Sequence, residues 1–204
     1  MNKGVLYVVS GPSGAGKGTI CAEVLKKRPD IFLSVSATTR APREGEIEGK
    51  SYYFMTQEDF EAKKAGGGFL EWAHFCGNNY GTPRDKVMSA IDGNRDVILE
   101  IEVQGAMKIR SEYPEAVFIF VMPPKFEELR ERLIKRSTEG EEKIAERIKT
   151  ANWELSQLKK YNYVLINDEV DRATAQFIAI IDAEKARIER NTELLSKLDS
   201  GNAI

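Results

Sequence analysis

The residues with the clearest chemical spacing are GPSGAGKGT, at positions 11–19. Glycines leave main-chain N–H groups free of Cβ atoms, so that a loop can close around phosphate oxygens. Lys17 adds a mobile positive charge, while Gly18 stands where a hydroxyl that contacts Mg²⁺ is usual, and the hydroxyl comes one place late, at Thr19. The alternative is a glycine turn that serves only strand–helix packing. The predicted nucleotide loop comprises Gly11, Pro12, Ser13, Gly14, Ala15, Gly16, Lys17, Gly18 and Thr19.

The segments on either side of this loop are the elements that would position it. VLYVV, at residues 5–9, is a compact β-branched run typical of a strand buried on both faces. KGTICAEVLKKR, at residues 17–28, has apolar residues on one helical face and ends at Pro29. A helix beginning at Lys17 would point the positive end of its dipole at an anion in the loop. The order strand, glycine loop, helix therefore supports a phosphate loop.

A second set of candidate residues lies in TTRAPREGEIEGKSYYF, at residues 38–54. Arg40 and Arg43 are three apart across Pro42, so both can face one anion, and arginine forks suit phosphate oxygens. Tyr52 and Tyr80 could each donate a phenol proton to the same group. Taken singly, arginines such as these are more often surface charges, and only the combination favours a phosphate site.

Glu71 is an acid within the short apolar strand FLEWAHF. A carboxylate there could accept two hydrogens from a guanine edge, whereas adenine offers no N1 proton and would be rejected. The alternative is an acid on an exposed strand face. Around it, residues 31–84 mix short strands and turns with a helix capped by Thr56, which predicts an inserted, mostly polar lobe.

The rest of the chain alternates buried strands with amphipathic helices. Strands are expected within residues 95–105, 116–124 and 163–167, and helices at 125–136, after residue 140, and as one continuous element over 172–198. This alternation predicts an α/β fold with a parallel sheet covered on both faces. The last helix could pack on the core or on a second subunit. Both a monomer and a homo-oligomer are therefore compatible with the sequence.

Composition limits the classes of protein. The chain has 204 residues, a net charge of −2 and only two cysteines. The balanced charge argues against a dedicated nucleic-acid binder, and no apolar run is long enough to span a bilayer. The start does not read as a signal peptide, and Cys21 and Cys76 form no metal cluster, so we expect a cytoplasmic protein with free thiols and no membrane or nucleic-acid partner.

Several motifs together resemble the guanylate kinase family. They are VVSGPSGAGKGT, SVSATTRAPREGE, GKSYYF, FLEWAHFCGNNYGT and LEIEVQGA, and they cover the chain from about Val5 to about Asp168. The resemblance implies a P-loop parallel-sheet core flanked by helices (residues 1–33, 85–125 and 151–204). It also implies an inserted, mixed GMP-binding lobe (34–84) and a helical lid (126–150).

The resemblance also implies roles for individual residues in ATP-dependent phosphorylation of GMP. The loop over residues 11–18 would hold ATP, with Asn167 near the ATP base, and Mg²⁺ would be held mainly by phosphates and water. Glu100 stands where some members carry Asp, and Thr82 replaces a Ser. Arg40, Arg43, Tyr52 and Tyr80 would hold the GMP phosphate; Ser36, Glu71, Thr82 and Glu100 would face guanine; Lys17 and the lid arginines Arg132, Arg136 and Arg147 would be catalytic.

Two other functions stay open at this point. The first is another nucleoside monophosphate kinase, which would lack the guanine preference expected from Glu71 and Ser36. The second is a non-catalytic guanylate-kinase-like interaction module. Such modules typically have a degraded phosphate loop, whereas this chain keeps Lys17 and the arginine pair.

Overall fold

The computed structural model describes residues 3–75, 77–125 and 141–199. Cys76, residues 126–136 of the helix expected at 125–136, and with them the predicted lid arginines Arg132 and Arg136, lie outside the described residues. Arg147 falls within a described helix, but its side chain is outside the description. No helix among the described residues is long and apolar enough to cross a membrane.

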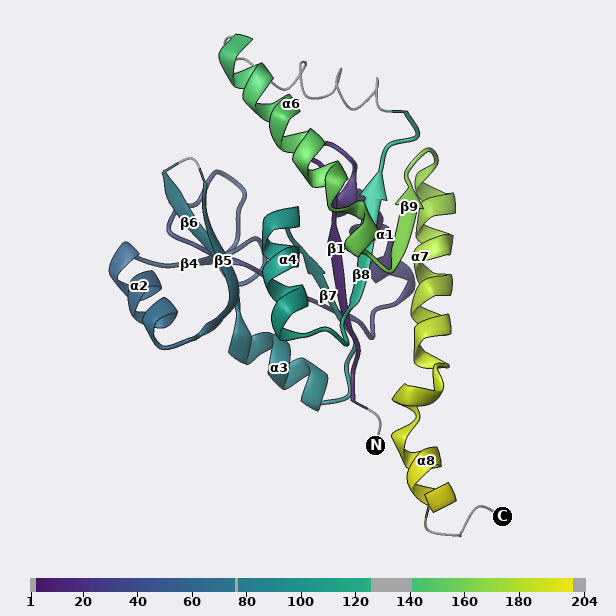
Figure 1. The fold of residues 1–204 in the computed structure, drawn as a ribbon. Helices are drawn as coiled ribbons and strands as arrows, with labels where there is room; N and C mark the ends of the chain where they lie inside the picture. The colour runs from purple at the N-terminus through teal and green to yellow at the C-terminus, as the bar shows by residue number, and fades with distance from the viewer. Residues whose placement is uncertain (1–2, 76, 126–140, 200–204) are drawn as a thin grey trace.

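A parallel sheet forms the centre of the described structure (Figure 1). Its strand order is β2-β7-β1-β8-β9, and every neighbouring pair is parallel. The α/β class with a parallel core is therefore confirmed, and the phosphate loop follows the central strand. The strands are β1 (Leu6–Ser10), β2 (Phe32–Leu33), β7 (Val97–Glu100), β8 (Val117–Met122) and β9 (Tyr163–Ile166).

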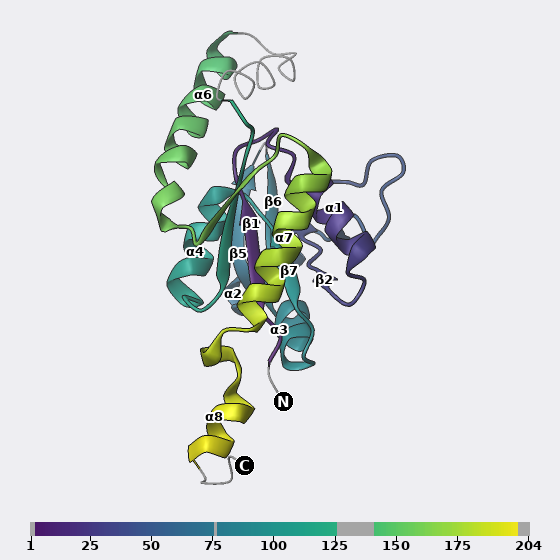
Figure 2. The same ribbon diagram turned by 90° about the vertical axis from the view of Figure 1, so that its right-hand side faces the viewer.

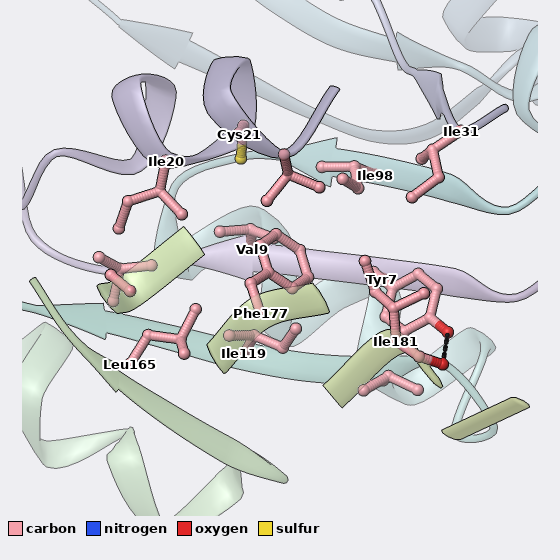
Figure 3. Packing of buried hydrophobic residues seen from close by; sticks show 14 of the residues in the cluster. Tyr7, Val9, Ile20, Cys21, Ile31, Ile98, Ile119, Leu165, Phe177 and Ile181 are labelled. Atoms are coloured by element: carbon pink, nitrogen blue, oxygen red, sulfur yellow. Dashed lines mark hydrogen bonds between the residues drawn. The ribbon is translucent and has the colours of Figure 1, made fainter. Parts of the chain in front are cut away.

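Helices cover both faces of this sheet (Figures 1 and 2). Alternate residues of β1 point to opposite faces: Tyr7 and Val9 belong to the hydrophobic cluster that includes α1 and α7 side chains. Leu6 and Val8 belong to the cluster on the side of α3 and α4. Figure 3 shows the first cluster, where the Tyr7 hydroxyl donates to the carbonyl of Ile181 at 3.2 Å. The helices are α1 (Lys17–Lys27), α3 (Arg84–Asp92), α4 (Val103–Glu112), α6 (Glu141–Ser156) and α7 (Val170–Lys185).

A second, smaller sheet is inserted between β2 and α3, with strand order β4-β3-β6-β5. Its main pairings, β3 with β6 and β5 with β6, are antiparallel, and Phe60 of α2 stacks on Phe69 at 4.5 Å between ring centroids. As predicted, Thr56 caps α2 by accepting the Asp59 N–H at 3.0 Å. The elements are β3 (Ala37–Thr38), β4 (Tyr53–Phe54), α2 (Gln57–Ala65), β5 (Phe69–Phe75) and β6 (Asn78–Pro83). All fall within the lobe predicted at 34–84, whose exact limits stay a prediction.

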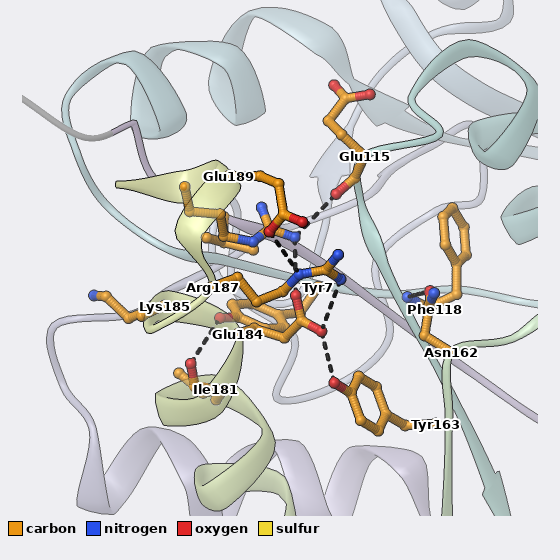
Figure 4. Close-up of polar contacts among 12 residues, drawn as sticks. Tyr7, Glu115, Phe118, Asn162, Tyr163, Ile181, Glu184, Lys185, Arg187 and Glu189 are labelled. Atoms are coloured by element: carbon orange, nitrogen blue, oxygen red, sulfur yellow. Dashed lines mark hydrogen bonds and ion pairs between the residues drawn. The ribbon is translucent and has the colours of Figure 1, made fainter. Parts of the chain in front are cut away.

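The expectation of one helix over residues 172–198 is wrong. The chain instead forms α7, a 3₁₀ turn η2 (Ile188–Arg190) and α8 (Thr192–Asp199). Arg187 leaves the helical region, with φ −60° and ψ 137°. The Arg190 guanidinium then reaches both the buried Glu184 carboxylate and the Glu115 carbonyl at 3.1 Å each, while Tyr163 donates to Glu184 at 2.6 Å (Figure 4). A buried carboxylate needs such partners, and this outweighs continued helix.

Candidate active site

The phosphate loop joins the end of β1 to the start of α1. Three of its glycines have positive φ, 148° at Gly11, 86° at Gly14 and 90° at Gly16, a region that favours glycine. Two of them also leave no room for a side chain. A Cβ at Gly11 would lie 2.2 Å from the Val121 carbonyl oxygen, and one at Gly16 would lie 2.1 Å from the Asn167 amide nitrogen. Glycine is therefore required here by both conformation and space.

Lys17 begins α1 and folds back over the loop. It is 8 % exposed, and its Nζ donates to the carbonyl of Gly11 at 2.6 Å and to that of Pro12 at 3.4 Å. Gly16 provides no side-chain cap, so the first-turn N–H groups of α1 are free to meet an anion. The ammonium and these N–H groups together favour an anionic ligand such as a phosphate chain.

Asn167, which follows β9, is held against the loop. Its main-chain N–H donates to Met122 at 2.7 Å, and its side-chain amide donates to the carbonyl of Ala15 at 2.8 Å. The structure thus places Asn167 as a support of the loop. Its expected position near the ATP base stays a prediction.

The lobe brings three of the predicted GMP-phosphate residues together. The Arg40 guanidinium lies 5.4 Å from the centroid of the Tyr52 ring, and the Tyr52 and Tyr80 rings meet edge-on at 6.0 Å. Burial raises the pKa of Tyr52, so its phenol remains a hydrogen-bond donor. Tyr80 pairs with Thr38 between β6 and β3, so the sheet fixes this side of the cluster.

Glu46 completes the cluster and was missed by sequence reasoning. Its carboxylate accepts from Arg40 Nη2 at 2.7 and 3.0 Å and from the Arg43 main-chain N–H at 2.7 Å. The Arg40 hydrogen bond holds the pKa of Glu46 below its ordinary value, and Glu46 raises the pKa of Arg40. The only signal in the sequence was an acid three residues after Arg43, in a loop where charged residues are common.

Glu71 on β5 is buried, with 8 % exposure. It accepts a hydrogen bond from the Thr82 hydroxyl at 2.7 Å, which pairs two residues that were predicted to face guanine. Burial raises the pKa of Glu71, opposed by the Thr82 hydrogen bond and by Lys108. A Cβ at Gly105 of α4 would lie 2.8 Å from its Oε2, so the glycine makes room for the carboxylate. Ser36 lies directly before β3, and its carbonyl accepts from Tyr53 at 2.9 Å.

Glu100, at the end of β7, lies beside the phosphate loop. Its two carboxylate oxygens are 3.4 and 3.5 Å from the position of a Cβ at Gly18. Burial raises its pKa, opposed by the positive charge of Lys17. The carboxylate therefore fills space next to the residue that lacks the usual hydroxyl, and its contact with guanine stays a prediction.

Sequence reasoning also missed Glu154, on α6. It is 6 % exposed, and burial, with a further contribution from Glu102, raises its pKa to about 7, while Lys17 opposes this shift. In the sequence it is simply a polar position beside the apolar Leu155. Its burial comes from residues far away in the chain, so no local pattern could have indicated it.

A phosphate loop on a parallel sheet, with a lobe that carries paired arginines and a buried carboxylate, defines a P-loop nucleotide phosphotransferase. The guanylate kinase family model matches residues 3–184. The chain belongs to the guanylate kinase family, whose members are ATP:GMP phosphotransferases.

Individual relatives agree with this assignment. The chain is 52% identical over 196 residues to guanylate kinase of Caldanaerobacter subterraneus subsp. tengcongensis, covering 96% of this chain and 95% of the relative. It is 53% identical over 188 residues to guanylate kinase of Clostridium acetobutylicum, covering 92% and 90%. The crystal structure of guanylate kinase from Anaplasma phagocytophilum matches with a TM-score of 0.80 and 35% identity, over 100% of this chain and 97% of that one.

Proposed function

We propose that the chain transfers the γ-phosphoryl group of ATP to GMP, giving ADP and GDP, with ATP on the phosphate loop and GMP in the lobe of the second sheet. The observation that carries this assignment is the buried Glu71 carboxylate, held by Thr82 within the lobe that presents Arg40. That combination suits a ligand with a guanine edge at one end and a phosphate at the other. It extends the family assignment to the residues of this chain.

Glu71 supplies the choice of base. An ionised carboxylate accepts hydrogens from guanine N1–H and from the exocyclic amine, and adenine cannot provide the first. The Thr82 hydrogen bond fixes the carboxylate and favours its ionised form. None of the acceptor contacts in this proposal uses the ribose 2′-hydroxyl, so dGMP is proposed as a second substrate.

The arginine–tyrosine cluster holds the acceptor phosphate. Arg40 and Arg43 screen its negative charge, which would otherwise repel the incoming phosphoryl group, and Tyr52 and Tyr80 donate phenol protons. The acceptor is already an ionised phosphate, so no general base is required. The protein's contribution is then alignment of the two nucleotides and neutralisation of charge.

Lys17 acts on the donor side, where charge spreads over the equatorial oxygens of the transferred group. Its amine leaves the carbonyls of Gly11 and Pro12 and turns to the outer phosphates of ATP. Arg147 on α6, together with Arg132 and Arg136, is proposed to approach from the lid. Removal of a lid arginine is expected to lower turnover much more than GMP affinity.

Mg²⁺ is proposed to accompany ATP, held mainly by phosphates and water. This fits the donor set, because Gly18 has no hydroxyl and no group of three or more His, Cys, Asp or Glu in the described parts of the chain is arranged to hold a metal ion. The half-buried Glu100 carboxylate beside Gly18 is the group best placed to accept from metal-bound water. Bound there, the cation would neutralise phosphate charge.

The reaction is proposed to take place in the cytoplasm, where the buried Cys21 thiol stays reduced.

An assay coupled to ADP release tests the function directly. Purified protein with ATP and Mg²⁺ is given GMP, dGMP, AMP, UMP or CMP in turn. ADP release is expected with GMP and dGMP, with the other nucleotides at least about a hundredfold less efficient. A preference for AMP would overturn the base assignment. No ADP release with any acceptor, while Arg40→Ala binds GMP as tightly as the parent, would overturn the kinase assignment.

A further inference from the structure

A hydrogen bond ties the phosphate loop to a residue that the reaction above does not use. Ser10, the last residue of β1, is fully buried and directly precedes Gly11. Its hydroxyl is hydrogen-bonded to the hydroxyl of Tyr161. Ser10 pairs with Phe120 across β1 and β8, and the Tyr161 ring meets Phe120 edge-on at 4.9 Å, so the tyrosine lies over both strands.

The Tyr161 hydroxyl is a fixed point. Its ring also meets Phe118 edge-on at 6.2 Å. The next residue, Asn162, is held at both ends by Phe118: its N–H donates to the Phe118 carbonyl at 2.9 Å, and its side-chain oxygen accepts the Phe118 N–H at 2.8 Å (Figure 4). Burial raises the pKa of Tyr161 to about 12, so the phenol keeps its proton at neutral pH. The ring is thus anchored by β8, with its hydroxyl presented to Ser10.

Tyr161 also lies close to the end of α6, the helix that leads out of the proposed lid. The short 3₁₀ turn η1 (Leu158–Lys160) separates it from α6. Leu155 of α6 and Leu158 of η1 pack against the hydrophobic cluster around Phe120, and Figure 1 shows the start of α6 extending beyond the sheet. Glu154, in the same anchored part of α6, lies within electrostatic range of Lys17. Tyr161 and Glu154 therefore lie near opposite ends of the phosphate loop, Tyr161 at Ser10 and Glu154 near Lys17.

We propose that Tyr161 is a positioning residue for the donor nucleotide, whose hydroxyl fixes the entry of the phosphate loop through Ser10. The inference rests on the proposed function, which assigns this loop to ATP. The Gly11 carbonyl, one residue on, accepts from Lys17 Nζ at 2.6 Å, so a displaced Ser10 moves both the first N–H of the loop and the rest position of the lysine. The Ser10–Tyr161 hydrogen bond also connects the loop to the segment that follows the C-terminal end of α6.

The substitution Tyr161→Phe tests the hydroxyl without removing the ring that packs on Phe118 and Phe120. Loss of one buried hydrogen bond is expected to raise the KM for ATP and the Kd for ADP about three- to tenfold, with the KM for GMP unchanged within about twofold. Ser10→Ala should give the same change. The double variant should be no worse than either single one, because both remove the same contact.

Tyr163→Phe is the matched control. It removes a tyrosine hydroxyl from the adjacent strand β9 and breaks a hydrogen bond to the buried Glu184, but it does not touch the loop. It is expected to lower the melting temperature and leave both KM values unchanged.

The inference is overturned if Tyr161→Phe lowers the melting temperature while leaving the KM for ATP and the Kd for ADP unchanged, or if its effect adds to that of Ser10→Ala. Calorimetric binding of ADP keeps this test separate from the proposed function. A parent that makes no GDP would refute the function, whereas the ADP Kd of the variants would still decide the role of Tyr161.

Discussion

The phosphate loop and the arginine–tyrosine cluster both suit a phosphate, but they are built from different groups. The loop relies on main-chain N–H groups and on glycines that leave no room for a side chain, as at Gly11 and Gly16. The cluster relies on side chains from the turns around Arg40 and Tyr52 and from strand β6, held by the Arg40–Glu46 ion pair. The geometry of the donor site is thus set by the main chain, whereas that of the acceptor site is set by contacts between charged side chains.

This difference separates what mutations can do on the two sides. A change in the loop must alter main-chain geometry or remove the one charge that Lys17 contributes. A change in the lobe removes a single side-chain contact and leaves the parallel sheet untouched. Donor and acceptor parameters should therefore respond independently, and the predictions for Lys17, Glu71 and Glu46 below test that independence.

The largest effect is expected from Lys17→Ala. The ammonium is the only fully charged group that the loop directs to the transferred phosphoryl group, so turnover should fall about a thousandfold. GMP affinity, measured by calorimetry without ATP, should not change. Lys26→Ala on the same helix, which removes only an exposed pair with Glu23, is the control and should have full activity. A large loss of GMP affinity in Lys17→Ala would show that the two sides are not independent.

The next largest effect is expected from Glu71→Gln. The amide keeps the shape of the carboxylate but can turn a donor toward guanine N1–H, so kcat/KM for GMP should fall about a hundredfold. The Kd for ADP should be that of the parent. Glu61→Gln, at an exposed site on α2 where the acid pairs with Lys64, controls for loss of a charge in the lobe. If Glu71→Gln discriminates between GMP and AMP as well as the parent does, Glu71 does not recognise the base.

The donor side could be predicted from the sequence because its determinants are local. A β-branched run, glycines at 11, 14 and 16 and a lysine at the start of a helix are all read within about twenty residues, and the structure has each of them. The parallel sheet followed from the alternation of strands and helices. The hydrogen bonds by which Asn167 and Tyr161 support the loop join residues 152 and 151 positions apart, and no local pattern predicted either contact.

On the acceptor side no single position predicts the site, and the prediction needed a combination of residue types together with the family motifs. Arg40 differs from a surface arginine by its partners Glu46 and Tyr52. Glu46 in turn sits in a charged loop with no periodicity to mark it as a partner. The end of the chain shows the same limit. Its apolar spacing continues a helix beyond Lys185, but the contacts of Arg190 with Glu184 and Glu115 break it.

Glu154, which lies near Lys17 on the donor side, is expected to make the stability of the protein depend on pH. Its pKa is about 7 against an ordinary 4.5, so between these values the folded protein keeps a proton that the unfolded chain has released. Stability should therefore fall as pH rises through this window. Glu154→Gln should remove that contribution and be about 1–3 kcal/mol more stable than the parent at pH 8, with a smaller difference near pH 4. Urea unfolding of both proteins across this range measures it, and parallel curves would contradict the assignment.

The smallest effect is expected from Glu46→Ala. Glu46 holds Arg40 and the Arg43 main chain in the orientation that a phosphate would meet, so its loss should raise the KM for GMP about fivefold through loosened arginines. The KM for ATP should not change, and neither should kcat by more than about twofold. Glu44→Ala removes an exposed acid two residues earlier and serves as the control. The opposite result, tighter GMP binding in Glu46→Ala alone, would mean that Glu46 competes with the GMP phosphate for Arg40. In that case Glu46 would occupy the place of the GMP phosphate on Arg40 in the free protein, whereas the phosphate loop contains no carboxylate of its own.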